Sequence, residues 1–453
     1  MGRAPTIAVL GASGLIGQSV ARDLARRGFH VQAIARRFTD AQGAGLDATI
    51  APVAALDPAA LSRLFDEACA DIVINCVGVL QDSARGRSAD INGAFVSRLL
   101  AAVAACARPI LLVHVSVPGA PADDATDFSR SKRGAERAIA ASGAPFVILR
   151  PGFVIAPNAY GGSALIRALA ALPCDLPARE ANRPFAATAI GDIAATIAAV
   201  AERWRAGERD WRAVWDVMER APDTVGGVVR AFRAHFGGPR AWFAFPGWLL
   251  DLGARSGDFA ARLGWAPPIR TTALVEMRRG VEGDPSAWIA VTGIEPASLQ
   301  VALASTPATI QERWFGRLYL AKALVIATLA LFWIASGAIA LTAGFEAAAD
   351  HLTSRGFPRS VANALVSLTS LLDIAIGAMI AQRRSCRAGL LTGVAAALGY
   401  LAGATLLAPE LWGDPLGPLV KIAPAIVLMI VALAMLDDRE ARFTPSLPAP
   451  STA

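Results

Sequence analysis

Long apolar segments dominate the last third of this chain and constrain its fold more than any other feature. From residue 318 onward, four stretches each approach the roughly 20 apolar residues that a helix needs to cross a bilayer. They cover residues 318–341, 361–380, 388–408 and 419–436. Buried helices of soluble proteins rarely follow one another in this way. The pattern predicts an all-α bundle of four transmembrane helices over residues 314–440, followed by a disordered tail at 441–453.

Arginines in the connecting loops predict how this bundle is oriented. Cytoplasmic loops close to membrane helices carry an excess of positive charge. Three arginines stand in the loop 382–387, and Arg439 and Arg442 follow the last segment, whereas the loop 409–418 contains no lysine or arginine. The first ten residues run directly into a strand-like segment, without the charged and apolar regions of a signal peptide. We therefore expect a multi-pass protein of the bacterial inner-membrane type, with both ends in the cytoplasm.

Asp373 places a carboxyl group inside the second apolar segment. Such a group is costly at membrane depth, and it usually faces the bundle interior and pairs with a partner. At 1.5 Å per residue, Asp373 lies about 10 Å from the cytoplasmic end of its helix and Lys322 about 6 Å deep from the same side. Lys322 is therefore the expected partner, and Lys421, on the opposite side, is a poorer one. The alternative is a protonated carboxyl group that bonds to the backbone, Ser367 or Ser370.

Short β-type runs alternate with helical stretches in the residues before the apolar segments. The β-type runs cover residues 6–10, 31–35, 72–77, 110–115 and 146–149. Alternation of this kind is typical of an α/β domain with a doubly wound parallel sheet.

A glycine-rich turn follows the first β-type run. Glycines let the backbone turn tightly and approach a pyrophosphate, while the N-terminus of the following helix offers N–H groups and its positive dipole end to an anion. This order of strand, turn and helix predicts a dinucleotide-binding site, and the other interpretation is an ordinary turn between strand and helix. The predicted contacts are Gly11, Ser13, Gly14, Leu15, Ile16 and Gly17.

The end of the second β-type run indicates which dinucleotide is bound. Domains that prefer NAD(H) place an acidic residue there, about 20 residues beyond the glycines, on the ribose 2′-hydroxyl. This chain has Arg36 and Arg37 instead. A guanidinium binds phosphate oxygens in a bidentate manner, so these residues favour NADP(H) over NAD(H). The alternative is a solvated loop edge, because 40 of the 43 basic residues are arginine.

Composition argues against other functional classes. The net charge is +6, but the arginines are scattered and no basic run is interleaved with aromatic residues, so no nucleic-acid partner is expected. The five cysteines form no CxxC pair and the four histidines show no metal-ligand spacing, so neither a disulfide framework nor a metal site is expected. With 54% hydrophobic residues, the chain is too apolar for a purely soluble protein.

Short motifs along the first 300 residues form a recognisable series. Besides the glycine turn, they are Asn75-Cys76-Val77-Gly78, Ile91-Asn92-Gly93, His114-Val115-Ser116, Ser131-Lys132 and Leu149-Arg150-Pro151-Gly152. In order and spacing they resemble the atypical and extended short-chain dehydrogenases/reductases, above all the branch with the nucleotide-binding accessory subunit of respiratory complex I. The resemblance implies a Rossmann-like domain at residues 1–211, with Val77 and Gly78 at the cofactor, and a small α+β substrate-side portion at 212–313.

A second resemblance concerns the apolar region. The runs Leu-Leu-Asp-Ile at 371–374 and Leu-Trp-Gly-Asp-Pro-Leu-Gly-Pro-Leu-Val-Lys at 411–421 are similar to the four-helix DoxX-like membrane family. This similarity covers about residues 314–440.

The superfamily resemblance also implies a catalytic serine, tyrosine and lysine. Ser116 and Lys132 fall on two of these positions, and the lysine would contact the nicotinamide ribose. Phe128 stands at the tyrosine position and has no ionisable proton. Only three residues of the chain are lysines, so a lysine kept at position 132 favours a functional role, because arginine cannot reproduce its compact ammonium group. The candidates to replace the tyrosine are Asp127, Ser129, Ser131 and Lys132 itself.

Three functions are consistent with these motifs. The first is a membrane-anchored NADP(H)-dependent oxidoreductase that acts on an apolar or quinone-like substrate dissolved in the lipid bilayer. The second is a non-catalytic nucleotide-binding module that structures or regulates a membrane protein complex. The third places the function in the bundle, as a transporter or redox partner with a nucleotide-sensing domain. The aromatic run at 242–250 fits a pocket wall, a patch at the membrane interface or ordinary core packing.

Overall fold

The chain consists of two compact units. The computed structural model describes residues 4–80, 89–415 and 417–436. The first unit comprises residues 1–261 and 266–317, and the second comprises residues 262–265 and 318–453. The expected boundary at residue 314 lies close to the observed one, and both fall inside one continuous helix, α14 (Ile310–Leu341). The tail expected at 441–453 lies outside the described residues, and so do Arg439 and Arg442.

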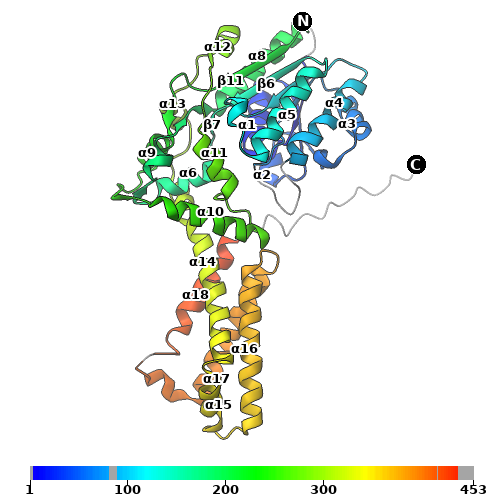
Figure 1. The fold of residues 1–453 in the computed structure, drawn as a ribbon. Helices are drawn as coiled ribbons and strands as arrows, with labels where there is room; N and C mark the ends of the chain where they lie inside the picture. Colours follow the sequence, from blue (N-terminus) through cyan, green and yellow to red (C-terminus); the bar gives the residue numbers. More distant parts are fainter. Residues whose placement is uncertain (1–3, 81–88, 416, 437–453) are drawn as a thin grey trace, which may run out of the picture. The chain divides into compact units, whose positions relative to one another are not determined.

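A seven-stranded parallel sheet forms the centre of the first unit (Figure 1). The strands lie in the order β3-β2-β1-β4-β5-β6-β11. Every residue of β1 is buried, as expected for a central parallel strand with helices on both faces. Because β2 pairs with one edge of β1 and β4 with the other, the strand order reverses between β1 and β4. The strands are β1 (Thr6–Leu10), β2 (His30–Ala35), β3 (Asp47–Ile50), β4 (Ile72–Asn75), β5 (Leu111–Val115), β6 (Phe146–Pro151) and β11 (Arg212–Val217).

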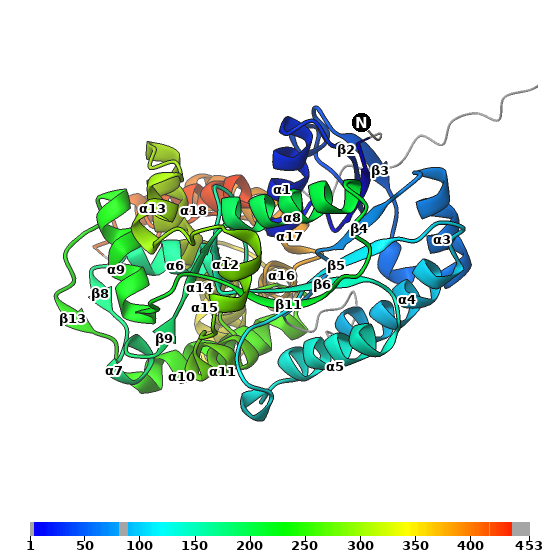
Figure 2. The ribbon, with the colours of Figure 1, turned by 90° about the horizontal axis from the view of Figure 1, so that it is seen from above.

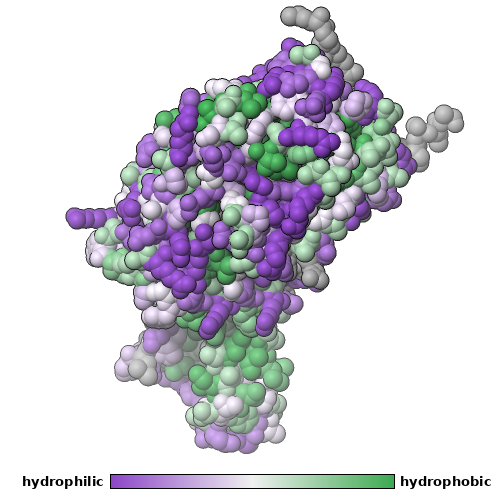
Figure 3. Space-filling view, turned by 45° about the horizontal axis from the view of Figure 1, so that its top comes forward, coloured by the Kyte–Doolittle hydropathy of each residue, from purple (hydrophilic) through white to green (hydrophobic). Residues whose placement is uncertain are grey.

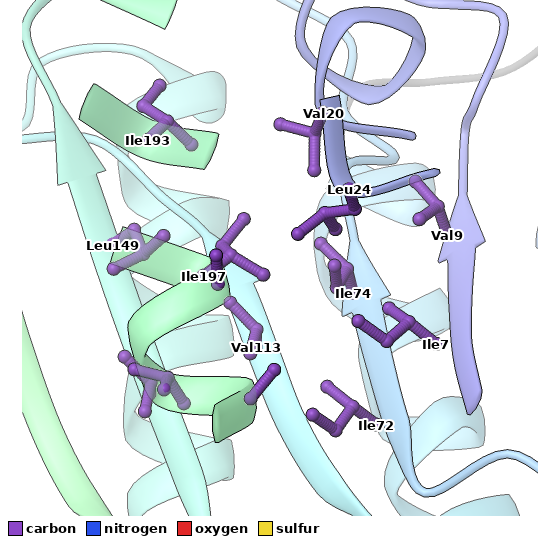
Figure 4. Packing of buried hydrophobic residues seen from close by; sticks show 14 of the residues in the cluster. Ile7, Val9, Val20, Leu24, Ile72, Ile74, Val113, Leu149, Ile193 and Ile197 are labelled. Carbon is purple, nitrogen blue, oxygen red and sulfur yellow. The ribbon is translucent and has the colours of Figure 1, made fainter. Parts of the chain in front are cut away.

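Helices cover both faces of this sheet, so the predicted doubly wound fold is confirmed (Figure 2). Val20 and Leu24 of α1 and Ile193 and Ile197 of α8 pack on one face, as Figure 4 shows. A second apolar cluster joins α3, α4 and α5 to the other face. The helices are α1 (Leu15–Arg26), α3 (Pro58–Glu67), α4 (Phe95–Ala105), α5 (Asp127–Ala141) and α8 (Ile190–Arg205).

The expected division at residue 211 differs from this topology. β11 begins at Arg212 and pairs in parallel with β6 along its whole length, so it belongs to the nucleotide-binding sheet. Conversely, β7 and α6, which precede residue 211, share an apolar cluster with α9 and α13. The smaller subdomain is therefore assembled from both sides of the expected boundary. Its elements include β7 (Phe153–Ile155), α6 (Gly162–Ala170), β10 (Ala187–Ala189), α9 (Val225–Phe236), α10 (Gly247–Arg262), α11 (Thr271–Arg279) and α13 (Leu299–Ala304). By contrast, α12 (Ser286–Thr292) packs its buried Trp288 against the core of the main sheet.

Short elements complete the first unit. Two-residue strands form two small sheets, in which β9 pairs with β12 and β8 pairs with β13. These elements are α2 (Asp40–Gly43), β8 (Cys174–Asp175), α7 (Ala178–Ala181), β9 (Pro184–Phe185), β12 (Asp223–Thr224) and β13 (Phe243–Ala244).

The second unit is helical, and hydrophobic side chains dominate its outer surface in the lower part of Figure 3. Among the described residues, three helices are long and apolar enough to cross a membrane: α14, α16 and α17. A short helix, α15, lies between the first two. The remaining bounds are α15 (Phe345–Thr353), α16 (Arg359–Ala381), α17 (Cys386–Leu407) and α18 (Ile422–Met435).

The fourth expected span is shorter than its apolar sequence suggests. Gly417 has a left-handed φ of 57°, a turn follows it, and α18 begins only at Ile422. Its 14 described residues extend about 21 Å, less than the hydrocarbon thickness of about 30 Å. The backbone of this turn, rather than hydrophobicity, sets the start of the helix.

Asp373 has a different partner from the one that the sequence suggested. Tyr400 of α17 donates a hydrogen bond from its phenol to Asp373 Oδ1 on α16, at 2.7 Å. The expected partner was Lys322, and the alternative was a serine of the same helix. The register between α16 and α17 brings the tyrosine and the carboxyl group together. The depth of each residue in the membrane, on which the expectation rested, does not specify this register.

Candidate cofactor site and its catalytic positions

The glycine turn has a geometry that only glycine permits at two positions. Gly11 has a φ of 78°, and its N–H donates to the Ile34 carbonyl at 2.9 Å. A Cβ atom on Gly17 would lie 2.4 Å from the Gly11 carbonyl oxygen, which is a severe clash. Gly14 donates to the same carbonyl at 2.9 Å. The turn therefore holds the first residues of α1 directly against the end of β1.

The N-terminus of α1 has the features of an anion site. Gly14 is the N-cap residue, no side chain caps the helix there, and its first turn carries no acidic residue. The first N–H groups of an α-helix have no partner inside the helix, and they favour phosphate at this position. Leu15 and Ile16 form the first turn and pack their side chains on the apolar core, so they orient the helix.

The residues after β4 lie beside the glycine turn. A Cβ atom on Gly11 would stand 3.2 Å from the backbone of Cys76 and Val77. This contact spans the point where the strand order reverses, which is where doubly wound sheets bind ligands. Val77 and Gly78 are therefore next to the predicted pyrophosphate position.

Two arginines stand at the carboxyl end of β2. Arg36 and Arg37 follow Ala35 directly, and both are exposed. The next residues form the start of α2, whose Gln42 donates from Nε2 to the Ser13 carbonyl at 3.3 Å. The arginine pair and the glycine turn are thus connected through one short helix.

Lys132 lies beside the residues that follow β4. Its Nζ donates to the Val115 carbonyl at 2.8 Å, and a Cβ atom on Gly78 would lie 3.1 Å from that Nζ. Asn92 makes two hydrogen bonds with the backbone of Val79, at 3.0 and 3.1 Å. Burial lowers the pKa of Lys132 to about 8, against smaller opposing effects of Cys76 and Glu136. The lysine therefore changes charge in a range close to neutral pH.

A polar pair, Asn75 and His114, joins the carboxyl ends of β4 and β5. The Asn75 amide donates to His114 Nδ1 at 3.0 Å, and Asn75 Oδ1 accepts from the Val77 N–H, also at 3.0 Å. Burial, with a smaller effect of the Lys132 charge, holds the pKa of His114 well below its ordinary value. A neutral histidine accordingly fixes Asn75, and Asn75 fixes the backbone at Val77.

Ser116 follows β5 and is buried. Its N–H donates to the Leu149 carbonyl at 2.7 Å, whereas its hydroxyl makes no well-formed hydrogen bond. The hydroxyl lies near Glu136 and contributes to lowering the pKa of that carboxyl group.

The residues around Phe128 are engaged in forming the start of α5. Ser129 is buried in a capping box with Thr126, and Ser131 donates to the Phe128 carbonyl at 2.9 Å. Asp127 is exposed and pairs with Arg130 at 2.7 Å. Three of the four candidates to replace the missing tyrosine thus serve local helix structure, and Lys132 is the fourth.

Comparisons with known proteins match a different family in each of the two compact units. Residues 7–210 match the model of the NAD dependent epimerase/dehydratase family, and residues 330–430 match that of the DoxX-like family. The chain joins an epimerase-like domain to a DoxX-like membrane domain. Both resemblances are therefore confirmed, and the epimerase-like domain is of the NAD(P)-binding type.

One solved structure shares the fold of the epimerase-like domain. WbmG from Bordetella bronchiseptica, in complex with NAD, aligns with a TM-score of 0.51 at 16% identity, over 67% of this chain and 93% of that one. UDP-glucuronic acid 4-epimerase from Bacillus cereus, in complex with UDP-glucuronic acid and NAD, aligns with a TM-score of 0.49 at 15% identity, over 69% and 99%. The comparison with curated proteins gave no match.

A buried ion network in the epimerase-like domain was not predicted from the sequence. Glu136 accepts hydrogen bonds from Arg133 and Arg150, and Arg133 also pairs with Asp124 at 3.2 Å. Arg279 of α11 reaches Asp124 at 3.2 Å. The network connects α5, β6 and α11 next to Ser116. The sequence signal for this network was the motif Leu149-Arg150-Pro151-Gly152, because Arg150 belongs to the network.

The aromatic run at 242–250 is divided between two environments. Phe245 and Leu250 pack against the apolar cluster of the smaller subdomain. Trp242, Phe243 and Trp248 are exposed. Core packing thus accounts for only part of the run.

Proposed function

We propose that this chain is a membrane-anchored NADP(H)-binding protein whose epimerase-like domain holds the cofactor without tyrosine-based proton transfer. In this role the domain structures or regulates a membrane protein complex. The observation that carries the proposal is Phe128 at the tyrosine position, with Ser129 and Ser131 engaged in the structure of α5. A positioned acid or base commonly contributes about 10²- to 10⁴-fold to a rate, and the phenylalanine at the tyrosine position provides none.

The arrangement of residues fits a nicotinamide dinucleotide. The glycine turn and the N-terminus of α1 would hold the pyrophosphate, because no side chain caps the helix there and Gly17 lets it pack directly against the turn. Arg36 and Arg37 would bind the 2′-phosphate, and no acidic residue stands at the end of β2 to prefer a 2′-hydroxyl. Lys132 would bind the nicotinamide ribose. A bound nicotinamide would supply hydride chemistry.

A second candidate is an oxidoreductase in which Lys132 supplies the proton. A pKa of about 8 makes the Lys132 ammonium group a usable acid near neutral pH. This group donates a hydrogen bond to the Val115 carbonyl, and the buried Ser116 is the next residue. The substrate class that suits a membrane-anchored enzyme is an apolar or quinone-like carbonyl compound. This candidate requires that the lysine act directly on the substrate.

Cofactor titration of the full chain in lipid nanodiscs tests the proposal. We expect calorimetry to show at least about tenfold tighter binding of NADPH than of NADH, since a charge-assisted hydrogen bond contributes about 1.5–3 kcal/mol. The double variant Arg36→Ala, Arg37→Ala should lose this preference. Arg26→Ala, at the other end of α1 and largely exposed, is the matched control. Equal affinities of the wild type for NADPH and NADH would contradict the proposal.

Turnover separates the two candidates. NADPH oxidation is measured with a panel of quinones and aldehydes on the same nanodisc sample. Slow or absent oxidation with intact NADPH binding supports the binding module, and Phe128→Tyr should then raise the rate. Brisk oxidation that is abolished in Lys132→Met would instead establish the oxidoreductase.

A further inference from the structure

One helix of the first unit exposes an apolar face that the fold leaves uncovered. Trp248, Leu252 and Phe259 of α10 are 66%, 51% and 61% exposed. Their spacing of four and seven residues places them on one side of the helix. Exposed apolar residues occur singly on most proteins, but three large ones on one helical face are a feature that needs a partner.

The other sides of α10 are engaged within the first unit. Ala254 and Gly257 are buried, and a Cβ atom on Gly257 would lie 1.9 Å from the Ile269 carbonyl oxygen. Asp251 pairs with Arg278 at 2.9 Å, and Asp258 pairs with Arg270 at 3.0 Å. These contacts fix the rotation of the helix about its axis, so the apolar face points outward.

The residues that follow α10 belong to the second unit. The Leu263 carbonyl accepts from the Arg383 N–H at 2.9 Å, and Trp265 Nε1 donates to the Ala381 carbonyl at 2.7 Å. The Arg383 guanidinium also lies over the Trp265 ring, 5.4 Å from its centroid. Ala381 is the last residue of α16, and α17 begins at Cys386. The carboxyl end of α10 is therefore tied to the loop at one end of two membrane-spanning helices.

This attachment identifies the environment of the apolar face. A loop that joins two spanning helices lies at a membrane surface. Because Leu263, the residue directly after α10, bonds to this loop, the carboxyl end of α10 lies at the same surface. Arg255 and Arg262 of α10 are exposed, and the loop adds Arg383 and Arg384. Tryptophan and phenylalanine partition into the interfacial region, while arginine extends from apolar surroundings toward lipid phosphates.

We propose that α10 is an interfacial helix that lies in the headgroup region of the leaflet contacted by the loop 382–385. Trp248, Leu252 and Phe259 enter the lipid, and Arg255 and Arg262 bind anionic headgroups. This contact is additional to the spanning helices and restrains the epimerase-like domain at the surface. It does not depend on cofactor binding or turnover.

Photo-cross-linking of the full chain in nanodiscs tests this inference. The variant Leu252→p-benzoylphenylalanine is reconstituted with phosphatidylglycerol and phosphatidylethanolamine, irradiated and analysed by mass spectrometry. Ile50→p-benzoylphenylalanine is the matched control, because Ile50 is also an exposed apolar residue but lies in the edge strand β3. We expect lipid adducts at position 252 in severalfold higher yield than at position 50.

Other occupants of the face give different products. Adducts at position 252 that join two copies of the chain would overturn the proposal in favour of a self-association surface. A lipid-adduct yield no higher at position 252 than at position 50 would overturn it as well. A thermal unfolding scan of each variant confirms that the label leaves the first unit folded.

Discussion

Arg150 on β6 donates two hydrogen bonds to the Glu136 carboxylate on α5, at 2.8 and 2.5 Å. Glu136 also pairs with Arg133 at 2.9 Å, and its side chain is buried. One carboxylate thus binds two guanidinium groups of the epimerase-like domain, and Arg133 has a second acidic partner in Asp124. Removing one member of a buried ion pair leaves an uncompensated charge, which is far more costly than breaking an exposed pair.

Glu136→Gln should destabilise the full chain by about 3–5 kcal/mol at pH 7, measured by denaturant unfolding in detergent micelles. Glu208→Gln is the matched control. Glu208 pairs with Arg203 at 2.7 Å on the surface, where such pairs contribute about 1 kcal/mol or less. A similar loss of stability in both variants would contradict the special role of the buried network.

The stability difference between the wild type and Glu136→Gln should depend on pH. Burial alone would raise the pKa of Glu136, but hydrogen bonds from Arg150, the nearby Ser116 hydroxyl and the arginine charges hold it below its ordinary value. The stabilising contribution is therefore fully present above the unfolded-state pKa of about 4.3 and disappears as the pH falls through the lower folded-state pKa. The stability difference between wild type and Glu136→Gln should shrink below about pH 4. A difference that stays constant down to pH 3 would contradict this.

Lys132 should make stability rise with pH in the alkaline range. Burial lowers its pKa from 10.5 to about 8, so the unfolded chain binds more protons between these two values. The wild type should gain on the order of 3 kcal/mol across this interval, and Lys132→Met should lack this gain. Urea unfolding of both proteins at pH 7 and pH 10 measures the effect. Parallel pH profiles would show that the lysine is not desolvated.

Gly17→Ala should weaken NADPH binding by about tenfold or more, equivalent to 1.4 kcal/mol. The new methyl group would stand 2.4 Å from the Gly11 carbonyl oxygen and displace the N-terminus of α1. Gly191→Ala is a close control, because Gly191 also lies in the first turn of a helix and a Cβ there would meet no atom within 4 Å. Comparable affinities of the two variants would argue against pyrophosphate binding at this turn.

Tyr400→Phe should destabilise the DoxX-like unit by about 0.6–1.7 kcal/mol, the range measured for hydrogen bonds between membrane helices. Phenylalanine cannot donate to Asp373. A double-mutant cycle with Asp373→Ala, which removes the acceptor, followed by unfolding in mixed micelles, should show coupling energy between the two positions. Tyr160→Phe, at an exposed tyrosine of the first unit, controls for the loss of a hydroxyl group. Strict additivity at positions 373 and 400 would rule out the interaction.

Local patterns predicted the parts of the site that depend on local geometry. The glycine turn was predictable because Gly11, Gly14 and Gly17 satisfy a turn and a helix start within seven residues. The absence of a tyrosine at position 128 was also visible in the sequence, but the capping box that engages Ser129 is visible only in the structure. The pair Asn75–His114 spans 39 residues, and its geometry depends on the parallel register of β4 and β5.

By itself, the sequence determined the class of each part of this protein. Apolar segments of membrane-spanning length specify a helical bundle, because unpaired backbone groups are too costly in lipid for other structures. Alternating β-type and helical runs with a glycine turn specify a doubly wound nucleotide-binding sheet. Only the tertiary structure decided that β11 joins this sheet, that Arg150 compensates Glu136 and that Tyr400 binds Asp373. Each of these depends on the register and rotation of elements far apart in sequence, and many registers satisfy the same hydrophobic pattern until the whole chain is packed.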